Sequence, residues 1–483
     1  MQFNSYIFIM AFLPGIILLY FLANKLHSAA GKVVLVLGSL LFYGYADKTM
    51  LLFLLASIII NYFFAILMNH LKQKPIKLLL AIPIIINVCL LLYFKYTNFI
   101  LENINNLFHT EYTLLTIVLP VGISFFTFQQ IAYLVSVSRK ELPNTNLLDY
   151  LVYITFFPKL LMGPLIEPVD FISQLNHPDT KKVNATHIAW GLKIFSFGLF
   201  KKVVLADTFA SAVSWGYRNL ETATAMDMIL ITLFYTFEIY FDFSGYSDMA
   251  VGSSKMLNIE LPINFDSPYK ALSIRDFWKR WHISLTKFLT KYIYIPLGGS
   301  RKGIVFTCVN TMIVFLVSGV WHGANWTFIL WGILHGLLSV FDRIFDKLEE
   351  KVFEPVRWFF TFCFVNVLWL LFRSDSIAQW KYIMKRMIYL EDTSISNGLM
   401  EYFILPESTF LSDLLHLSYF ENHIRGFWML LFLVVSFGIC LIPNNNYKKL
   451  RKLTFLSMIA AAIAMVWGIL CLGSESQFVY FGF

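Results

Sequence analysis

The chain has 483 residues, of which 58% are hydrophobic, 18% are aromatic and only 14% are charged. Soluble globular chains carry about 25% charged residues, so this sequence has too few polar side chains to cover a surface that faces water. The composition excludes an ordinary soluble fold and predicts a protein that crosses a membrane many times. The formal net charge of +8 does not indicate a nucleic-acid partner, because Lys and Arg collect in the cytoplasmic loops of membrane proteins.

The expected membrane spans follow from the length of the apolar runs, since a bilayer core about 30 Å thick needs about 20 apolar residues per helix. We expect them near 6–23, 33–46 with 50–68, 76–96, 115–137, 148–166, 187–214, 225–250, 303–321, 325–345, 355–373, 426–443 and 453–473. This is an all-α polytopic fold of roughly 11–13 transmembrane helices. We expect re-entrant or interfacial helices between 187 and 300, an interfacial helix over 379–390, and one membrane-embedded domain over 1–483.

The five cysteines lie singly inside apolar runs. They are Cys89, Cys308, Cys363, Cys440 and Cys471. No CxxC pair is present, so the pattern predicts neither a disulfide framework nor a metal–thiolate site.

Ionisable residues at membrane depth are costly and usually mark a function, and this chain concentrates them between 238 and 335. We therefore expect the catalytic core region over 238–336. Its first cluster holds Glu238 and Asp242, which are four residues apart and share a helix face, and Asp248, which lies on another. These carboxylates either bind substrate hydroxyls and handle protons, or pair with basic residues of the following segment.

The second cluster covers residues 275–292, which we expect to form one helix. At 100° per residue, Trp278, Trp281 and His282 fall on an apolar, aromatic face, while Arg275 and Lys279 fall in another sector. The basic sector suits anionic lipid headgroups or the phosphates of a nucleotide-bearing donor. For His282, packing and chemistry both remain open.

The third cluster is built around His322, which is followed by Gly323 and Asn325, with His335 thirteen residues further on. A helix is expected to end near His322, and Asn325 is suited to cap the next one. No HExxH motif is present and few carboxylates follow, so we expect no metal site. One or two histidines acting in acid–base chemistry remain as the interpretation.

A series of motifs follows the same order as in a known family. They are FNSYIFIMAFLP at the start, LPVGISFFTFQ at 119–129, FFPKLLMGPLIEP at 156–168, GLFKKVVLAD at 198–207, YFDFSGYSDMAVG at 240–252, NFDSPYKALSIRDFWKRWHISLTKFLTKYIYIPLGG at 264–299 and WHGANWTFILWGILHG at 321–336. In these motifs the chain resembles the membrane-bound O-acyltransferase family, and within it the alginate O-acetylation membrane subunits. One departure is that Lys159 and Glu167 place charges in the motif at 156–168, which is expected to be less charged.

The resemblance implies a catalytic histidine in the WHG motif, His322, and an upstream partner, His282, with His335 in a supporting role. It also implies a central tunnel, an acyl thioester donor taken from the cytosol and an extracytoplasmic partner protein. We assign His322 as general base and His282 as the supporting group. We assign substrate binding to Trp281, Trp278, Asn325 and Asp242.

The leading hypothesis is transfer of an acetyl group from acetyl-CoA, a donor substrate and not a bound cofactor, to a cell-surface polysaccharide. The expected location is the bacterial cytoplasmic membrane, and no metal is expected. An acyl carrier protein as donor, D-alanyl transfer to teichoic acid and O-acetylation of peptidoglycan remain alternatives within the same fold. A transporter or structural subunit whose histidines only pack is the alternative from another class.

Overall fold

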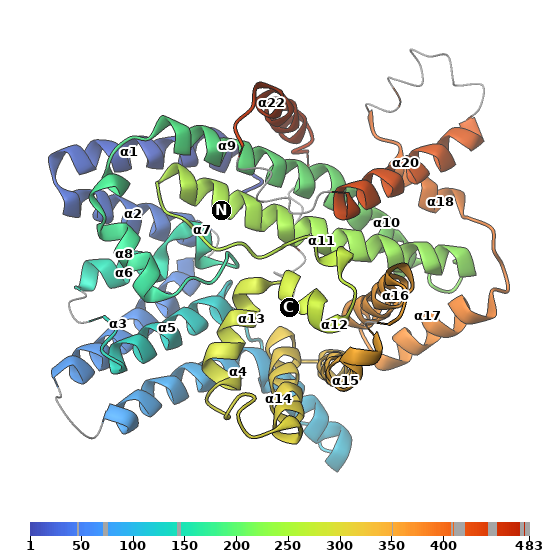
Figure 1. Cartoon of the computed structure of the whole chain (residues 1–483), viewed down its shortest axis with the longest axis horizontal. Helices are drawn as coiled ribbons and strands as arrows, with labels where there is room; N and C mark the ends of the chain where they lie inside the picture. Colours follow the sequence, from blue (N-terminus) through green and yellow to red (C-terminus); the bar gives the residue numbers. More distant parts are fainter. Residues whose placement is uncertain are drawn as a thin grey trace. The chain divides into compact units, whose positions relative to one another are not determined.

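The computed structural model describes residues 1–45, 48–70, 76–142, 146–349, 351–406, 409, 421–442, 452–473 and 478. All regular structure in these ranges is helical (Figure 1), which confirms the predicted all-α class. The chain divides into two compact units. Unit 1 comprises Met1–Gly198, Tyr246–Ile263 and Leu453–Phe483, and unit 2 comprises Leu199–Gly245 and Asn264–Lys452. The single domain over 1–483 stays a prediction.

Seven helices of the described ranges are long and apolar enough to cross a bilayer. They are α1 (Leu13–Leu26) with the preceding π-helical turn η1 (Phe8–Phe12), α3 (Lys48–His70), α4 (Ile76–Phe108), α11 (Ala225–Met256), α14 (Ile304–His322), α15 (Trp326–Glu349) and α16 (Glu354–Arg373). Four shorter apolar helices are α2 (Ser28–Gly44), α5 (Ile123–Ser138), α20 (Glu421–Leu441) and α22 (Phe455–Leu470). The chain is a multi-pass membrane protein.

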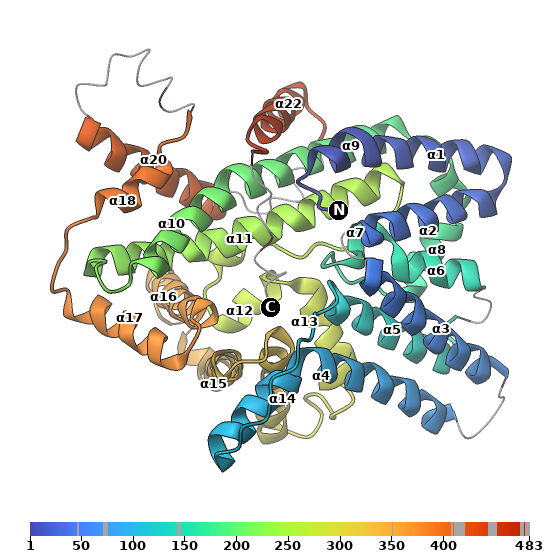
Figure 2. The same cartoon turned by 180° about the vertical axis from the view of Figure 1, so that it is seen from behind.

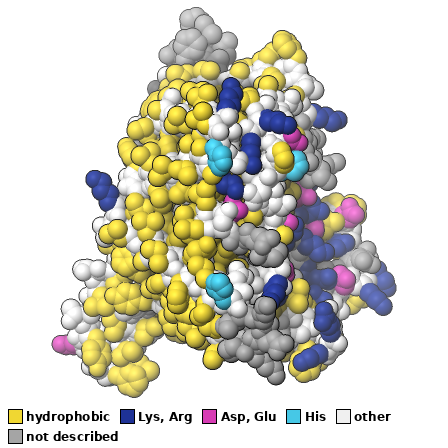
Figure 3. Space-filling view, turned by 90° about the vertical axis from the view of Figure 1, so that its left-hand side faces the viewer, with side chains coloured by type: hydrophobic (Ala, Val, Ile, Leu, Met, Phe, Trp, Pro, Cys, Tyr) yellow, Lys and Arg dark blue, Asp and Glu magenta, His cyan; other side chains and the backbone are white. Residues whose placement is uncertain are grey.

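Large apolar side chains lie on the outside of these helices, as a bilayer requires. Leu37, Leu41 and Ile59 are each more than 60% exposed. Figure 3 shows one face of the molecule on which apolar side chains form a broad expanse, with Lys and Arg gathered along one side. This distribution matches a surface that meets lipid over most of its area and water or headgroups at its edge.

Unit 1 also contains short helices that pack under the spans. They are α6 (Leu147–Thr155), α7 (Phe157–Leu160), α8 (Pro168–Asn176), η2 (Pro178–Lys181) and most of α9 (Ala185–Phe200). Lys32 on α2 ties two of them together, because its Nζ lies 2.5 Å from Asp149 Oδ1 on α6 and 2.6 Å from Asn176 Oδ1 on α8. The buried Lys32 ammonium is therefore paired within the helices of unit 1.

Three of the predicted spans differ in the structure. The run 115–137 is helical only from Ile123, the first residue of α5. The run 148–166 ends as a helix at Thr155, and Phe156 turns the chain with φ −48° and ψ 106° before α7. Pro158 explains the break, because proline has no N–H and its ring clashes with the preceding turn. The run 187–214 is α9, the π-helix η3 (Lys201–Ala206) and α10 (Asp207–Arg218) in succession.

Unit 2 carries the remaining helices. They are η4 (Pro268–Lys270), α12 (Ile274–Arg280), α13 (Ile283–Leu289), η5 (Thr290–Tyr294), α17 (Ile377–Tyr389), α18 (Asn397–Met400) and η6 (Glu401–Phe403), together with η3, α10, α14, α15, α16 and α20. The helix expected over 379–390 is confirmed as α17, which lies beside the end of α16 (Figures 1 and 2).

Two glycines let α14 and α15 approach closely. A Cβ at Gly319 would lie 2.4 Å from Phe328 O, and one at Gly332 would lie 2.5 Å from Phe315 O. Such distances exclude any side chain, and small residues are the usual means of close helix packing in membranes. Because His322 and His335 follow these glycines by three residues each, this crossing brings the two histidines to one region of unit 2.

Candidate active site

The three histidines of the predicted core meet in one aromatic cluster of unit 2. His282, His322 and His335 are all buried, with 1%, 4% and 1% of their surfaces exposed. The Trp321 ring lies between the first two, with its centroid 6.3 Å from that of His282 and 4.8 Å from that of His322. Trp331 in turn lies 5.1 Å from His322 and 4.6 Å from His335. The structure therefore brings together the pair that the sequence nominated.

His282 occupies a break between two helices and not the middle of one. The predicted continuous helix over 275–292 is wrong, because α12 ends at Arg280 and Trp281 is extended. His282 itself has φ 43° and ψ 51°, the left-handed conformation. That conformation costs a non-glycine residue about 1–2 kcal/mol, so tertiary contacts must hold it.

Asn264 supplies those contacts. Its backbone oxygen accepts from Ile283 N at 3.0 Å, and its side-chain Oδ1 accepts from Ser284 N at 3.2 Å. These bonds satisfy amide groups at the start of α13 that an unbroken helix would have bonded internally. The helical spacing of apolar residues over 275–292 gives no indication of these bonds to Asn264. The sequence therefore did not predict the break at His282.

The surroundings of His282 favour the neutral imidazole. Phe243 packs edge-on against it at a centroid distance of 4.8 Å, and burial lowers the pKa of His282 to about 3. A neutral imidazole can still donate a hydrogen bond to a developing oxyanion. This electrostatic state fits a supporting group better than a proton carrier.

His335 is oriented by a tryptophan. Trp278 Nε1–H donates to His335 Nδ1 at 3.2 Å, and this bond requires Nδ1 to be an acceptor. Trp278 also packs edge-on against Trp331 at 5.6 Å. The bond links α12 to α15, and the supporting role of His335 stays a prediction.

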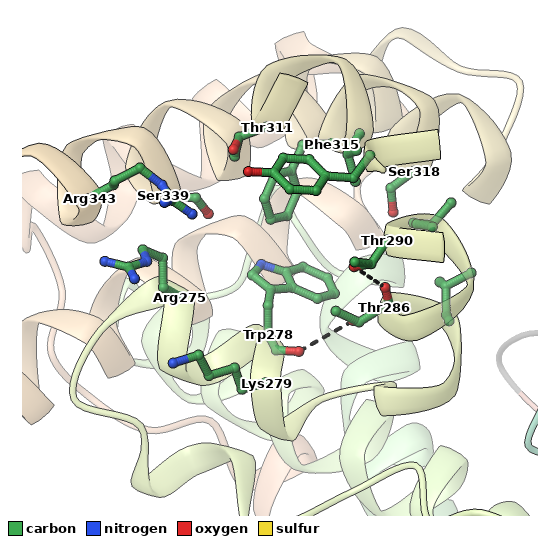
Figure 4. Close-up of a pocket in the computed structure, with 14 residues that line it drawn as sticks. Arg275, Trp278, Lys279, Thr286, Thr290, Thr311, Phe315, Ser318, Ser339 and Arg343 are labelled. Atoms are coloured by element: carbon green, nitrogen blue, oxygen red, sulfur yellow. Dashed lines mark hydrogen bonds between the residues drawn. The ribbon is translucent and has the colours of Figure 1, made fainter. Parts of the chain in front are cut away.

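A pocket opens beside Trp278 on the side of Arg275 and Lys279 (Figure 4). Its volume is about 280 Å³. Arg275, Lys279 and Arg343 gather at one end of the labelled lining, and Thr286, Thr290 and Ser318 lie toward the other. Ser318 precedes His322 by about one turn of α14. The lining thus runs from cationic groups, which suit phosphates, toward the helix end that carries His322.

Asp242 is held by an ion pair. Lys202 Nζ lies 2.6 Å from Asp242 Oδ1 and 2.9 Å from Asp207 Oδ1, and the side chains of Lys202 and Asp242 are almost fully buried. The pairing alternative expected a partner in the following segment, and that part is wrong because Lys202 precedes Asp242 by 40 residues. Glu238 is also buried, whereas Asp248 belongs to unit 1.

Asn325 caps the following helix as expected. Its Oδ1 accepts from Thr327 N at 3.0 Å, and its Nδ2 donates to Asp375 O at 2.9 Å. Trp281 is buried and packs against Trp369 at a centroid distance of 4.8 Å. Of the four residues assigned to substrate binding, Trp278 alone lines the pocket beside the histidines. The substrate contacts of all four stay predictions.

Aromatic residues that sequence reasoning did not nominate complete the cluster. Phe372 packs against His322 at 5.2 Å, and Trp369 lies 6.1 Å from Trp331. Both lie near the end of α16, in an apolar run whose pattern does not separate packing from function. Within the described ranges no three His, Cys, Asp or Glu side chains are grouped as metal ligands would be.

Comparison with known proteins places these residues in a wider context. The model of the membrane-bound O-acyltransferase family matches residues 78–374. The chain is 36% identical to the peptidoglycan O-acetyltransferase of Helicobacter pylori, over all of this chain and 97% of that protein. It is 35% identical to the probable alginate O-acetylase of Pseudomonas aeruginosa, over 78% of this chain and 73% of that one. The teichoic acid D-alanyltransferase of Streptococcus thermophilus is 29% identical over 48% of this chain and 59% of its own length.

Proposed function

Because the chain belongs to the membrane-bound O-acyltransferase family, we propose that it transfers acetyl groups from acetyl-CoA to hydroxyl groups of a polysaccharide in the bacterial cell envelope. The observation that carries the proposal is the meeting of His322 and His282 around Trp321. These are the two histidines that the family motifs nominate. The pocket lined by Arg275, Lys279 and Arg343 supports a donor that carries phosphates.

The proposed reaction gives each histidine a distinct task. A sugar hydroxyl is a poor nucleophile, so neutral His322 takes its proton while the hydroxyl oxygen attacks the thioester carbonyl. His282 donates a hydrogen bond to the oxyanion that forms, and loss of one such donor costs about 3–4 kcal/mol. The carbon–sulfur bond then breaks, the ester is released, and the CoA thiolate recovers the proton from His322. Atoms and charge balance without a metal or a resident cofactor.

The donor is proposed to enter along the cationic end of the pocket. Arg275 Nη1 lies 3.3 Å from Asp346 Oδ1. This ion pair holds the Arg275 guanidinium at the cationic end of the pocket. Lys279 lines the same pocket. Phosphates held there would leave the thioester end of the donor free to extend past Trp278 toward Ser318. An acyl carrier protein would instead dock its own phosphopantetheine at this entrance, so dependence on free acetyl-CoA separates the two donors.

For the acceptor, peptidoglycan is the first candidate. The peptidoglycan O-acetyltransferase relative is matched over the whole of this chain, while the alginate O-acetylase relatives are matched over 78% of it. An alginate-like surface polysaccharide is the second candidate, supported by nearly equal identity. D-alanyl transfer to teichoic acid has weaker support, because those relatives are matched over 48% of the chain.

The proposed location is the cytoplasmic membrane of a bacterium, with the lipid bilayer as the immediate environment. We propose that a separate extracytoplasmic protein receives the acetyl group or places it on the polymer. Nucleic acid is not among the proposed partners. Efficient acetylation of added polymer by the purified chain alone would contradict the need for that partner.

The decisive experiment follows acetyl transfer by the wild type and His322→Ala. Both are purified in detergent and supplied with radiolabelled acetyl-CoA, and release of CoA is measured together with label on the protein or on an added hydroxyl acceptor. Loss of the general base predicts a fall of about 100-fold or more. His177→Ala is the matched control, because the His177 side chain is 62% exposed in unit 1.

The control variant should match the wild type, and all three proteins should elute and melt alike. Near-normal activity of His322→Ala would remove His322 from the mechanism. Equal inactivity of wild type and variant with acetyl-CoA would instead favour a carrier-bound donor, a requirement for the absent partner protein, or a transporter role. Activity losses that follow melting temperature across several histidine variants would favour a purely structural cluster.

A further inference from the structure

A second cavity of unit 2 faces outward between α15, α16 and the start of α12. Its volume is about 480 Å³. The walls are mainly apolar, and Phe341, Phe360 and Phe364 are each about half exposed. These side chains belong to helices that are long and apolar enough to span a bilayer. The groove therefore opens where lipid chains surround the protein, and it is separate from the pocket at Trp278.

One guanidinium, that of Arg357, lines this apolar groove. Its Nε is buried and has no hydrogen-bond partner within the described part of the chain. A buried donor left without an acceptor destabilises the fold. The groove thus contains a half-buried guanidinium whose Nε–H lacks an acceptor among the described residues.

The depth of Arg357 identifies which acceptor is at hand. Arg357 is the fourth residue of α16, so at 1.5 Å per residue it lies about 4.5 Å from the first residue of the helix. That is the level of the lipid headgroups for a helix that starts at the membrane boundary. Guanidinium groups bind phosphate oxygens by paired hydrogen bonds. A phosphate above an apolar groove is the chemistry of a membrane phospholipid.

We infer that this groove binds one phospholipid of the surrounding membrane, with its phosphate on Arg357 and an acyl chain along Phe360 and Phe364. The Arg357 guanidinium selects the occupant, since an apolar helix from another chain would offer it no acceptor, and the Asp342 carboxylate of the same lining already accepts from Arg275 N. The cavity volume also leaves room for a chain and not only for a headgroup.

The groove shares a wall with the donor pocket. Asp342 lines the groove, and its Oδ2 accepts from the backbone N–H of Arg275 at 2.9 Å. Arg275 is the second residue of the short helix α12, which carries Trp278 and its bond to His335. A phospholipid in the groove therefore packs against the segment that positions the donor pocket. This consequence rests on the proposed function, whereas lipid binding itself does not.

The test counts bound lipid on the full-length protein in detergent. Wild type, Arg357→Gln and Arg357→Lys are stripped of lipid and titrated with phosphatidylglycerol, and bound lipids are counted by native mass spectrometry. We expect one phospholipid to stay on the wild type. Its apparent affinity should fall about 10-fold in Arg357→Gln, the range of one charge-assisted bond, and recover in part in Arg357→Lys. Arg301→Gln is the control, because Arg301 is an exposed arginine outside both cavities.

A phosphate-free lipid completes the design. Glucosyl diacylglycerol with the same acyl chains should not displace phosphatidylglycerol from the wild type at equal concentration. Equal retention by wild type and Arg357→Gln, or equal competition by the glucolipid, would overturn the inference. Should Arg357→Gln not fold, the competition on the wild type decides alone. A raised KM for acetyl-CoA in Arg357→Gln tests the link to the donor pocket, and its absence would leave lipid binding untouched.

Discussion

Two polar regions of unit 2 are buried in different ways. Around Lys202 opposite charges are paired, since its ammonium lies within 3 Å of carboxylates from both Asp207 and Asp242. Around His322 the neighbours are the rings of Trp321, Trp331 and Phe372. The first arrangement pairs opposite charges. The second surrounds an imidazole, which can gain or lose a proton, with apolar aromatic rings.

The difference indicates how polar residues in a membrane protein can be sorted. A buried ion pair with good geometry avoids the cost of an uncompensated charge, so its removal acts on folding. The imidazoles of His282 and His322 lie against aromatic rings instead, and we expect their removal to act on acyl transfer more than on folding. Burial alone does not separate the two classes, but the partners of each side chain do.

The largest effect is expected from removing the ammonium of Lys202, which pairs with Asp207 and Asp242. Lys202→Met leaves Asp242 and Asp207 without their cation, and removing one member of a buried pair costs about 3–5 kcal/mol. Unfolding of the purified protein by denaturant in mixed micelles measures this loss. The control is Lys182→Met, because Lys182 pairs with Asp179 at 3.1 Å on an exposed surface and such pairs contribute little.

A variant of Asp242 tests whether this carboxylate serves the stability of the fold or the binding of substrate. Asp242→Asn should lower stability in the same direction, because its loss leaves Lys202 with one carboxylate fewer. If Asp242→Asn instead melts like the wild type and raises KM for the acceptor, Asp242 binds substrate as first assigned and the two regions share one function.

The membrane helices and the two histidines could be predicted from the sequence, each for a physical reason. Hydropathy predicts membrane helices well because lipid leaves no alternative for the backbone, and the motifs located His282 and His322. The break at His282 could not be predicted, because Asn264, eighteen residues earlier, holds it through two hydrogen bonds. The Lys202–Asp242 partnership was missed for the same reason, since pairing across helices leaves no period in the sequence.

An effect of intermediate size is expected in the pH dependence of the free energy of unfolding, through His282. Burial lowers the pKa of His282 to about 3 in the folded protein, against about 6.5 in an unfolded chain. Below pH 6.5 the unfolded state therefore binds the extra proton, so the stabilisation that is complete above pH 6.5 is lost as pH falls toward 3. Between pH 6.5 and 5 the loss amounts to about 2 kcal/mol.

The variant His282→Asn isolates that contribution. Stability of wild type and His282→Asn is compared by denaturant unfolding at pH 7 and pH 5, and the acid-induced loss should be smaller in the variant. An identical pH dependence in the two proteins would show that His282 is not the neutral group described above.

The smallest effect concerns the bond that joins α12 to α15. Trp278→Phe keeps the ring packing but removes the donor to His335 Nδ1, and one neutral hydrogen bond contributes about 1 kcal/mol. Acetyl transfer is expected to fall about 5-fold with little change in melting temperature, because the aromatic contacts with Trp331 and Phe315 remain. If stability falls by the full amount while kcat is unchanged, the Trp278–His335 bond belongs with the Lys202 region as a structural contact. A loss confined to kcat would instead favour the supporting role predicted for His335, since orientation of its ring would then matter to the reaction and not to the fold.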